Sequence, residues 1–170
     1  RKNDKNMRLS LYDPQTKERW EETTKPITTG EEQGLLYCRW VEINRKKVEE
    51  LSGGKVGYVH VQGMNDGSYR TVYEDVLGKS AGKEALIVDT RFNGGGWLHD
   101  DLVTFLSGRK YMDFSPQGVK PTSGEPRNKW VGPSAVLMSE SNYSDAHIFP
   151  YAYKSLGIGK LIGMPVPGTG

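Results

Sequence analysis

The chain has 170 residues, a formal net charge of +2, and basic residues that are interleaved with acidic ones. This length is enough for one hydrophobic core, and the charge pattern gives no indication of nucleic-acid binding. No apolar run approaches the ~20 residues of a membrane-spanning helix, and no His/Asp/Glu cluster has the spacing of a metal site. The sequence therefore predicts a globular domain without a membrane span, a metal or a cofactor.

The first 28 residues form a separate segment. Residues 8–12 alternate in polarity, and residues 18–24 return as a second strand after a turn. Two strands cannot bury a core of their own. Beyond them, the apolar spacing over residues 35–51 predicts a long amphipathic helix. Cys38 lies on the apolar face of this helix, so we expect a buried structural thiol there.

Strands and helices alternate in the rest of the chain. The expected elements are strands over residues 56–61, 85–89 and 135–138, a helix capped by Ser68, a helix over 98–106, a Pro- and Gly-rich loop over 115–126, and a helix behind Ser144. This alternation predicts an α/β fold with a largely parallel sheet and right-handed crossovers. The turns that follow parallel strands lie at one edge of the sheet.

Three consecutive glycines, Gly94, Gly95 and Gly96, separate the strand over 85–89 from the helix over 98–106. A glycine costs backbone entropy in a regular element, but in a turn it lets N–H groups face a ligand with no Cβ in the way. Phosphate binding and oxyanion binding both use such a turn. The phosphate hypothesis is the weaker one, because neither the Walker spacing nor a full G-x-G-x-x-G is present.

Ser144 lies between an apolar strand and a predicted helix. The N-terminus of a helix offers free N–H groups and a positive dipole end, which suits a nucleophile whose attack creates an oxyanion. A serine at this position more commonly serves as an N-cap. Pro150 conflicts with the helix, since it cannot donate to the carbonyl of Ala146, at a cost of about 3 kcal/mol in a helix interior. We therefore expect an irregular first turn or a kink.

Four segments together point to a family: residues 56–61, 87–96, 144–146 and 159–163, in this order. They resemble the tail-specific (C-terminal-processing) serine peptidases, most closely their tricorn-protease branch, over residues 35–170. The resemblance implies a crotonase-like (ClpP/crotonase-type) α/β catalytic core over residues 29–170, incomplete at its C-terminus. It also implies that residues 1–28 are the closing strands of a preceding PDZ-like domain.

By this resemblance Ser144 is the nucleophile of a serine peptidase that hydrolyses peptide bonds through an acyl-enzyme. The oxyanion hole would use the backbone N–H of Asp145 and one from Gly94 or Gly95. The implied substrate is a peptide or an unfolded polypeptide, and a homo-oligomer is compatible with the family. The compartment would be the cytoplasm, or the periplasm if a signal peptide precedes the segment.

The general base is the residue that the sequence does not supply. His60 lies in an apolar strand, which favours a structural role, and His99 starts a helix, which favours capping or solvent contact. His147 lies three residues after Ser144 and near the same helix face. The resemblance instead implies a catalytic His and a Glu outside these 170 residues. The absence of lysine from residues 163–170 argues against the Ser/Lys dyad of the other branch.

Two alternative functions fit the same sequence. A non-catalytic peptide-binding or scaffold homologue could keep the fold. A crotonase-type acyl-thioester enzyme could use the same glycine turn as an oxyanion hole, although it needs no serine at the start of the helix.

Overall fold

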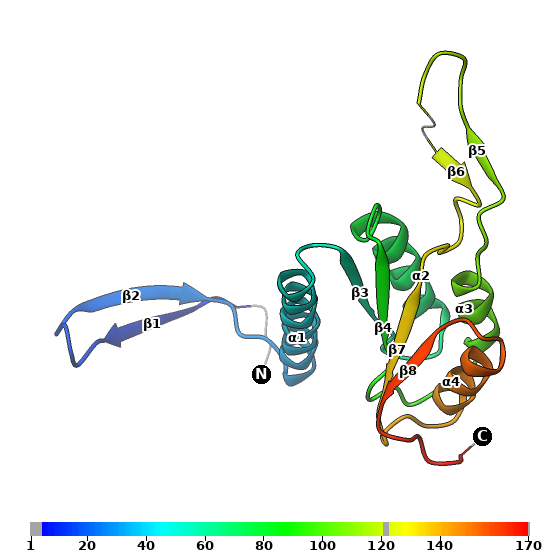
Figure 1. The fold of residues 1–170 in the computed structure, drawn as a ribbon. Helices are drawn as coiled ribbons and strands as arrows, with labels where there is room; N and C mark the ends of the chain where they lie inside the picture. Colours follow the sequence, from blue (N-terminus) through cyan, green and yellow to red (C-terminus); the bar gives the residue numbers. More distant parts are fainter. Residues whose placement is uncertain (1–4, 121–122, 170) are drawn as a thin grey trace. The chain divides into compact units, whose positions relative to one another are not determined.

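A computed structural model describes residues 5–120 and 123–169 (Figure 1). The chain divides into two compact units, Arg1–Glu42 and Ile43–Gly170. The first unit contains an antiparallel hairpin of β1 (Met7–Tyr12) and β2 (Arg19–Thr24), as the alternating pattern predicts. Every residue of these two strands except Leu11 is exposed.

Helix α1 (Thr29–Leu51) begins in the first unit. Thr28 and Glu31 start it with a capping box: the Thr28 hydroxyl accepts from the N–H of Glu31, whose carboxylate accepts from the N–H of Thr28. None of the residues of α1 is buried. The expectation of a buried thiol is therefore wrong, because Cys38 is exposed. The amphipathic spacing predicted the helix correctly but does not show what covers its apolar face.

The second unit is built on a parallel sheet with the strand order β3-β4-β7-β8. Its strands are β3 (Val56–His60), β4 (Ala85–Asp89), β7 (Ser134–Met138) and β8 (Lys160–Gly163). The predicted α/β fold with a largely parallel sheet is thus confirmed. Strand β8 is an addition to the prediction, since its four residues were read only as part of a motif.

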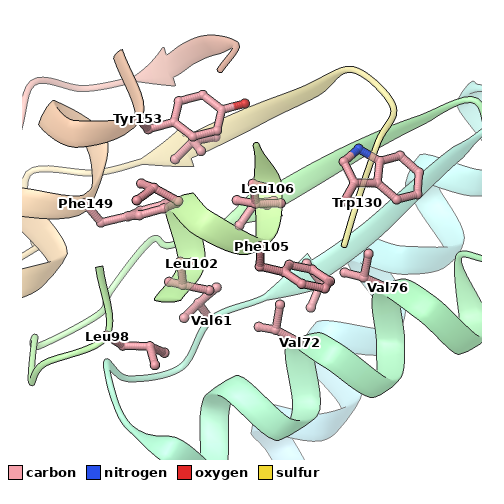
Figure 2. Packing of buried hydrophobic residues seen from close by; sticks show 14 of the residues in the cluster. Val61, Val72, Val76, Leu98, Leu102, Phe105, Leu106, Trp130, Phe149 and Tyr153 are labelled. Atoms are coloured by element: carbon pink, nitrogen blue, oxygen red, sulfur yellow. The ribbon is translucent and has the colours of Figure 1, made fainter. Parts of the chain in front are cut away.

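Three helices pack on one face of this sheet: α2 (Asp66–Glu74), α3 (His99–Leu106) and α4 (Asp145–Ser155). Alternate strand residues point into the core because successive side chains of a strand face opposite sides. The core residues from these elements include Val61, Val72, Leu98, Leu102, Phe105, Phe149 and Tyr153 (Figure 2). Each fully buried large side chain stabilises the fold by roughly 1.5–3 kcal/mol. The core therefore fixes where α3 and α4 begin.

Two local expectations differ from the structure. Asn65, not Ser68, caps α2: its side chain accepts from the N–H of Ser68. The loop expected over residues 115–126 overlaps a hairpin of β5 (Met112–Phe114) and β6 (Ser123–Glu125). A π-helical turn, Asp75–Lys79, also follows α2. These elements are too short for apolar periodicity to reveal them.

Candidate active site

Two strand-to-helix turns meet at the carboxyl edge of the sheet. One joins β4 to α3 and contains the three glycines, and the other joins β7 to α4 and contains Ser144. They meet because β4 and β7 are parallel neighbours. The N–H of Tyr143 donates to the carbonyl of Asn93 at 3.1 Å. A Cβ added to Gly95 would lie 2.7 Å from Ser144 Cβ. The structure thus brings the predicted serine and the glycine turn into contact.

Ser144 has an unusual backbone conformation. Its φ of 52° and ψ of −125° lie in a region that L-residues rarely adopt. Such a conformation costs of the order of 1–3 kcal/mol, and strained residues cluster at functional sites. Ser144 occupies the N-cap position of α4, yet its side chain makes no capping hydrogen bond. The capping role that commonly explains a serine here is therefore not the one it has.

The backbone N–H groups of the two turns differ in whether they have a hydrogen-bond partner. No acceptor for the N–H of Asp145 lies among the described residues, as expected in the first turn of a helix. The same holds, within the described ranges, for the N–H of Gly94. The N–H of Gly95, in contrast, donates to Asn93 Oδ1 at 2.8 Å. Of the two predicted glycines, only Gly94 has an N–H that makes no hydrogen bond within the described ranges.

Asn142 holds the turn that precedes Ser144, and Pro150 makes this possible. Pro150 lies inside α4 and has no N–H to offer the carbonyl of Ala146. The side-chain amide of Asn142 donates to that carbonyl instead, at 3.2 Å, and to Thr90 Oγ1 at 2.9 Å. Asn142 Oδ1 accepts from the N–H and hydroxyl of Ser139. The conflict that Pro150 creates is thus resolved by a fully buried asparagine.

The side chain of Asp145 connects the two helices. Its Oδ2 accepts from the N–H groups of Leu98 at 2.6 Å and His99 at 3.1 Å, and its Oδ1 lies 2.5 Å from His99 Nδ1. Asp145 is 1% exposed. Sequence reasoning considered only its backbone. The available signal was the start of α3, where Leu98 stands at the N-cap position and offers no side-chain acceptor.

An ion pair between the buried Asp89 and the partly exposed Arg91 fixes the start of the glycine turn. Both oxygens of Asp89 accept from the guanidinium of Arg91, and Tyr58 donates its hydroxyl to Asp89 Oδ2 at 2.7 Å. Burial raises the pKa of Tyr58 far above its usual value, and the hydrogen bond to Asp89 adds to this. Tyr58 therefore remains a neutral donor, and the ion pair anchors the chain just before Gly94.

The other two histidines differ in surroundings. His60 Nε2 bonds to the carbonyl of Arg91 at 3.0 Å. Burial lowers the pKa of His60, against the opposing effect of that hydrogen bond. A neutral, partnered ring of this kind has a structural role. His147 is half-buried on the first turn of α4, where its N–H donates to the carbonyl of Ser144 at 2.8 Å.

Residues 5–120 and 123–169 contain neither a metal-ligand cluster nor a helix fit to span a membrane. No group of three or more His, Cys, Asp or Glu residues in these ranges could hold a metal ion. No helix there combines the length and apolar character needed to cross a bilayer.

Residues 55–170 match the profile of peptidase family S41. The chain belongs to this family. It is 35% identical over 129 residues to the tricorn protease of Thermoplasma acidophilum, which covers 76% of the chain and 12% of that protein. It is also 35% identical over 138 residues to tricorn protease homolog 1 of Streptomyces coelicolor, which covers 81% of the chain and 13% of that protein. The chain thus spans about an eighth of the length of these relatives.

Solved structures agree with this membership. The crystal structure of the tricorn protease superposes with a TM-score of 0.83 at 29% identity, over 96% of the chain and 16% of that structure. The photosystem II D1 C-terminal processing protease superposes with a TM-score of 0.50 at 22% identity, over 68% of the chain and 32% of that structure. The resemblance to tail-specific and tricorn peptidases is therefore confirmed for the family and for the α/β architecture.

Proposed function

We propose that the protein is a serine peptidase that hydrolyses peptide bonds in peptides or unfolded polypeptides, with Ser144 as the nucleophile. The observation that carries this proposal is the strained conformation of Ser144, packed against Gly95 at a strand-to-helix turn. A strained serine on such a turn presents its hydroxyl at the edge of the sheet. Membership of a peptidase family supports the same reaction.

The oxyanion hole would be formed by the N–H groups of Asp145 and Gly94. Attack of Ser144 Oγ on a peptide carbonyl places a negative charge on the carbonyl oxygen, and the leaving amine departs as the acyl-enzyme forms. Two N–H donors beside the serine would stabilise this charge, and α4 adds its positive dipole end. Loss of one such donor typically costs about 10²–10³ in kcat. Gly95 contributes by its lack of a side chain.

The remaining parts of the catalytic apparatus would come from outside the 170 residues. A His that takes the proton of Ser144 and an orienting Glu are expected there by analogy with the tricorn branch. Residues 29–170 would form most of a crotonase-like core, and residues 1–28 the closing strands of a PDZ-like domain. The exposed hairpin of β1 and β2 supports this assignment, because two strands need further elements to bury a core.

Labelling with a fluorophosphonate tests the assignment in the full-length protein. The wild type should be labelled and should cleave peptides, whereas Ser144→Ala should do neither, with hydrolysis reduced by several orders of magnitude. Ser141→Ala is the matched control, because Ser141 is an exposed serine in the same loop. Labelling of the Ser144→Ala variant would reject the nucleophile. A thioester enzyme would hydrolyse acyl-thioesters without being labelled, and a scaffold would show neither activity.

The 170-residue chain alone should not cleave short fluorogenic peptides. Proton removal by a positioned base contributes about 10²–10⁴-fold, and the proposed base is absent from this chain. Cleavage that is lost in His147→Ala would instead locate the base within α4 and contradict the analogy with the tricorn branch.

A further inference from the structure

The carboxylate of Asp145 takes no part in bond making or breaking in the proposed mechanism, yet it is buried and joins the start of α3 to the start of α4. Three donors surround it: the N–H groups of Leu98 and His99, and His99 Nδ1. We propose that Asp145 and His99 are positioning residues, and that their contact sets the spacing of the N–H groups in the oxyanion hole. This inference rests on the proposed peptidase function.

The contact between Asp145 and His99 is short and lies next to two backbone donors. With an ionised carboxylate, which has no proton to donate, His99 Nδ1 is the donor of the 2.5 Å contact. The backbone donors of Leu98 and His99 are the otherwise free N–H groups at the start of α3. The buried carboxylate thus caps α3 from another helix, at the positive end of the α3 dipole. Each of the three described contacts of this carboxylate is thus with a hydrogen-bond donor.

Both ends of this contact are anchored. Leu98 is 2% exposed and lies in the core among residues of α3 and the sheet (Figure 2). Asp145 is followed by Ala146, which is fully buried. The contact therefore joins two rigid elements, and it will transmit the position of α3 to the first turn of α4.

The consequence for the oxyanion hole comes from chain connectivity. The N–H of Asp145 is on the same residue as the carboxylate, and Gly94 lies four residues before Leu98. The contact thus ties both proposed donors to one anchor. Donors must lie about 2.7–3.1 Å from the oxyanion to stabilise it, and a misplacement of about 1 Å can cost 10²-fold in rate. An effect on the rate of chemistry, rather than on substrate binding, is therefore expected.

Two substitutions of His99 distinguish the effect of its hydrogen bond to Asp145 from the effect of its size. In His99→Asn the side-chain amide nitrogen occupies nearly the place of Nδ1, so the donor is kept. In His99→Leu the donor is lost at similar size. In the full-length protein, His99→Leu should lower kcat about 10-fold with KM unchanged, and His99→Asn should stay within about 3-fold of the wild type. Asp145→Asn, which keeps its backbone N–H, should lower kcat by about 10–100-fold.

Amide hydrogen exchange over residues 143–149 provides a readout that does not need activity. Exchange should be faster in His99→Leu than in the wild type and in His99→Asn. Unchanged kcat and unchanged exchange in His99→Leu would overturn the inference while leaving the peptidase intact. Equal losses of several orders of magnitude in both His99 variants would also overturn it, since the ring itself would then take part in proton transfer. A wild-type protein that is inactive and not labelled by the fluorophosphonate would reject the proposed peptidase function, and with it the positioning of an oxyanion hole. Hydrogen exchange as expected would then support only the structural contact between α3 and α4.

Discussion

The two turns at the edge of the sheet place different residues at their positive φ angles. Both connect a strand to a helix. Where the turn before α3 approaches Ser144 it uses glycine, with φ of 95° at Gly95 and 141° at Gly96, although Phe92 earlier in the same turn also has a positive φ of 67°. The turn before α4 uses Ser144 at a φ of 52°. Glycine could adopt the backbone conformation of Ser144 without a Cβ penalty. The serine therefore retains its hydroxyl at an energetic cost.

Each turn is also held by a fully buried asparagine. Asn93 donates to the carbonyl of Val61 and accepts from the N–H of Gly95, while Asn142 donates to Thr90 and Ala146. A buried asparagine therefore supports each of the two turns. The turns differ in the groups that they bring together: the glycine turn contributes backbone without side chains, and the other turn contributes the side chain of Ser144.

Among substitutions that keep Ser144, the largest effect on activity is expected from a side chain added to the glycine turn. In Gly95→Ala, the new Cβ would lie 2.7 Å from both Ser144 Cβ and the carbonyl oxygen of Tyr143. We expect kcat/KM of the full-length protein to fall by roughly 100-fold or more, because the two turns must separate. Gly78→Ala is the control, since its Cβ would meet nothing within 4 Å. Equal activity of the two variants would show that the close approach is unimportant.

A smaller effect is expected when the support of the serine turn is removed. Asn142→Leu should lower the free energy of unfolding by about 1–3 kcal/mol, because the carbonyl of Ala146 and the hydroxyl of Ser139 lose a buried partner. Urea denaturation measures this loss. Asn128→Leu, at an exposed asparagine, should change stability by less than about 0.5 kcal/mol. Comparable losses in both variants would contradict the role of the buried amide.

The smallest effect concerns the strain itself. Ser144→Gly should be more stable than Ser144→Ala by up to about 1 kcal/mol, since glycine adopts this conformation without a Cβ penalty but has the more flexible unfolded chain. Both variants should be inactive, so thermal unfolding is the measurement. If the alanine variant is the more stable one, the backbone strain at Ser144 is smaller than the entropy that glycine adds to the unfolded chain.

The alternation of apolar strands and helices in the sequence predicted that the two turns lie together, because their place at the sheet edge follows from the strand order. Apolar strands alternating with helices imply parallel neighbours, and parallel neighbours place their following turns together. Contacts made by side chains far apart in sequence could not be foreseen. Asp145 lies 47 residues from Leu98, and Asn142 lies 52 residues from Thr90. Nothing in either sequence neighbourhood indicates such a partner. The burial of Cys38 was predicted wrongly for a related reason: an apolar helix face does not show which element, if any, packs on it.

Pro150 and Asn142 have a consequence for how this site can vary among descendants of one ancestral gene. The proline frees the carbonyl of Ala146, and the asparagine supplies the hydrogen bond that this carbonyl would otherwise lack. Replacing Pro150 by a residue with an N–H would restore an ordinary helix and leave one amide hydrogen of Asn142 without its acceptor. We therefore expect descendants that keep Pro150 to keep Asn142 as well, whereas Asn142 can persist without the proline through its bonds to Ser139 and Thr90. A helix-breaking residue is tolerated here because a second residue, outside the helix, replaces the hydrogen bond that it removes.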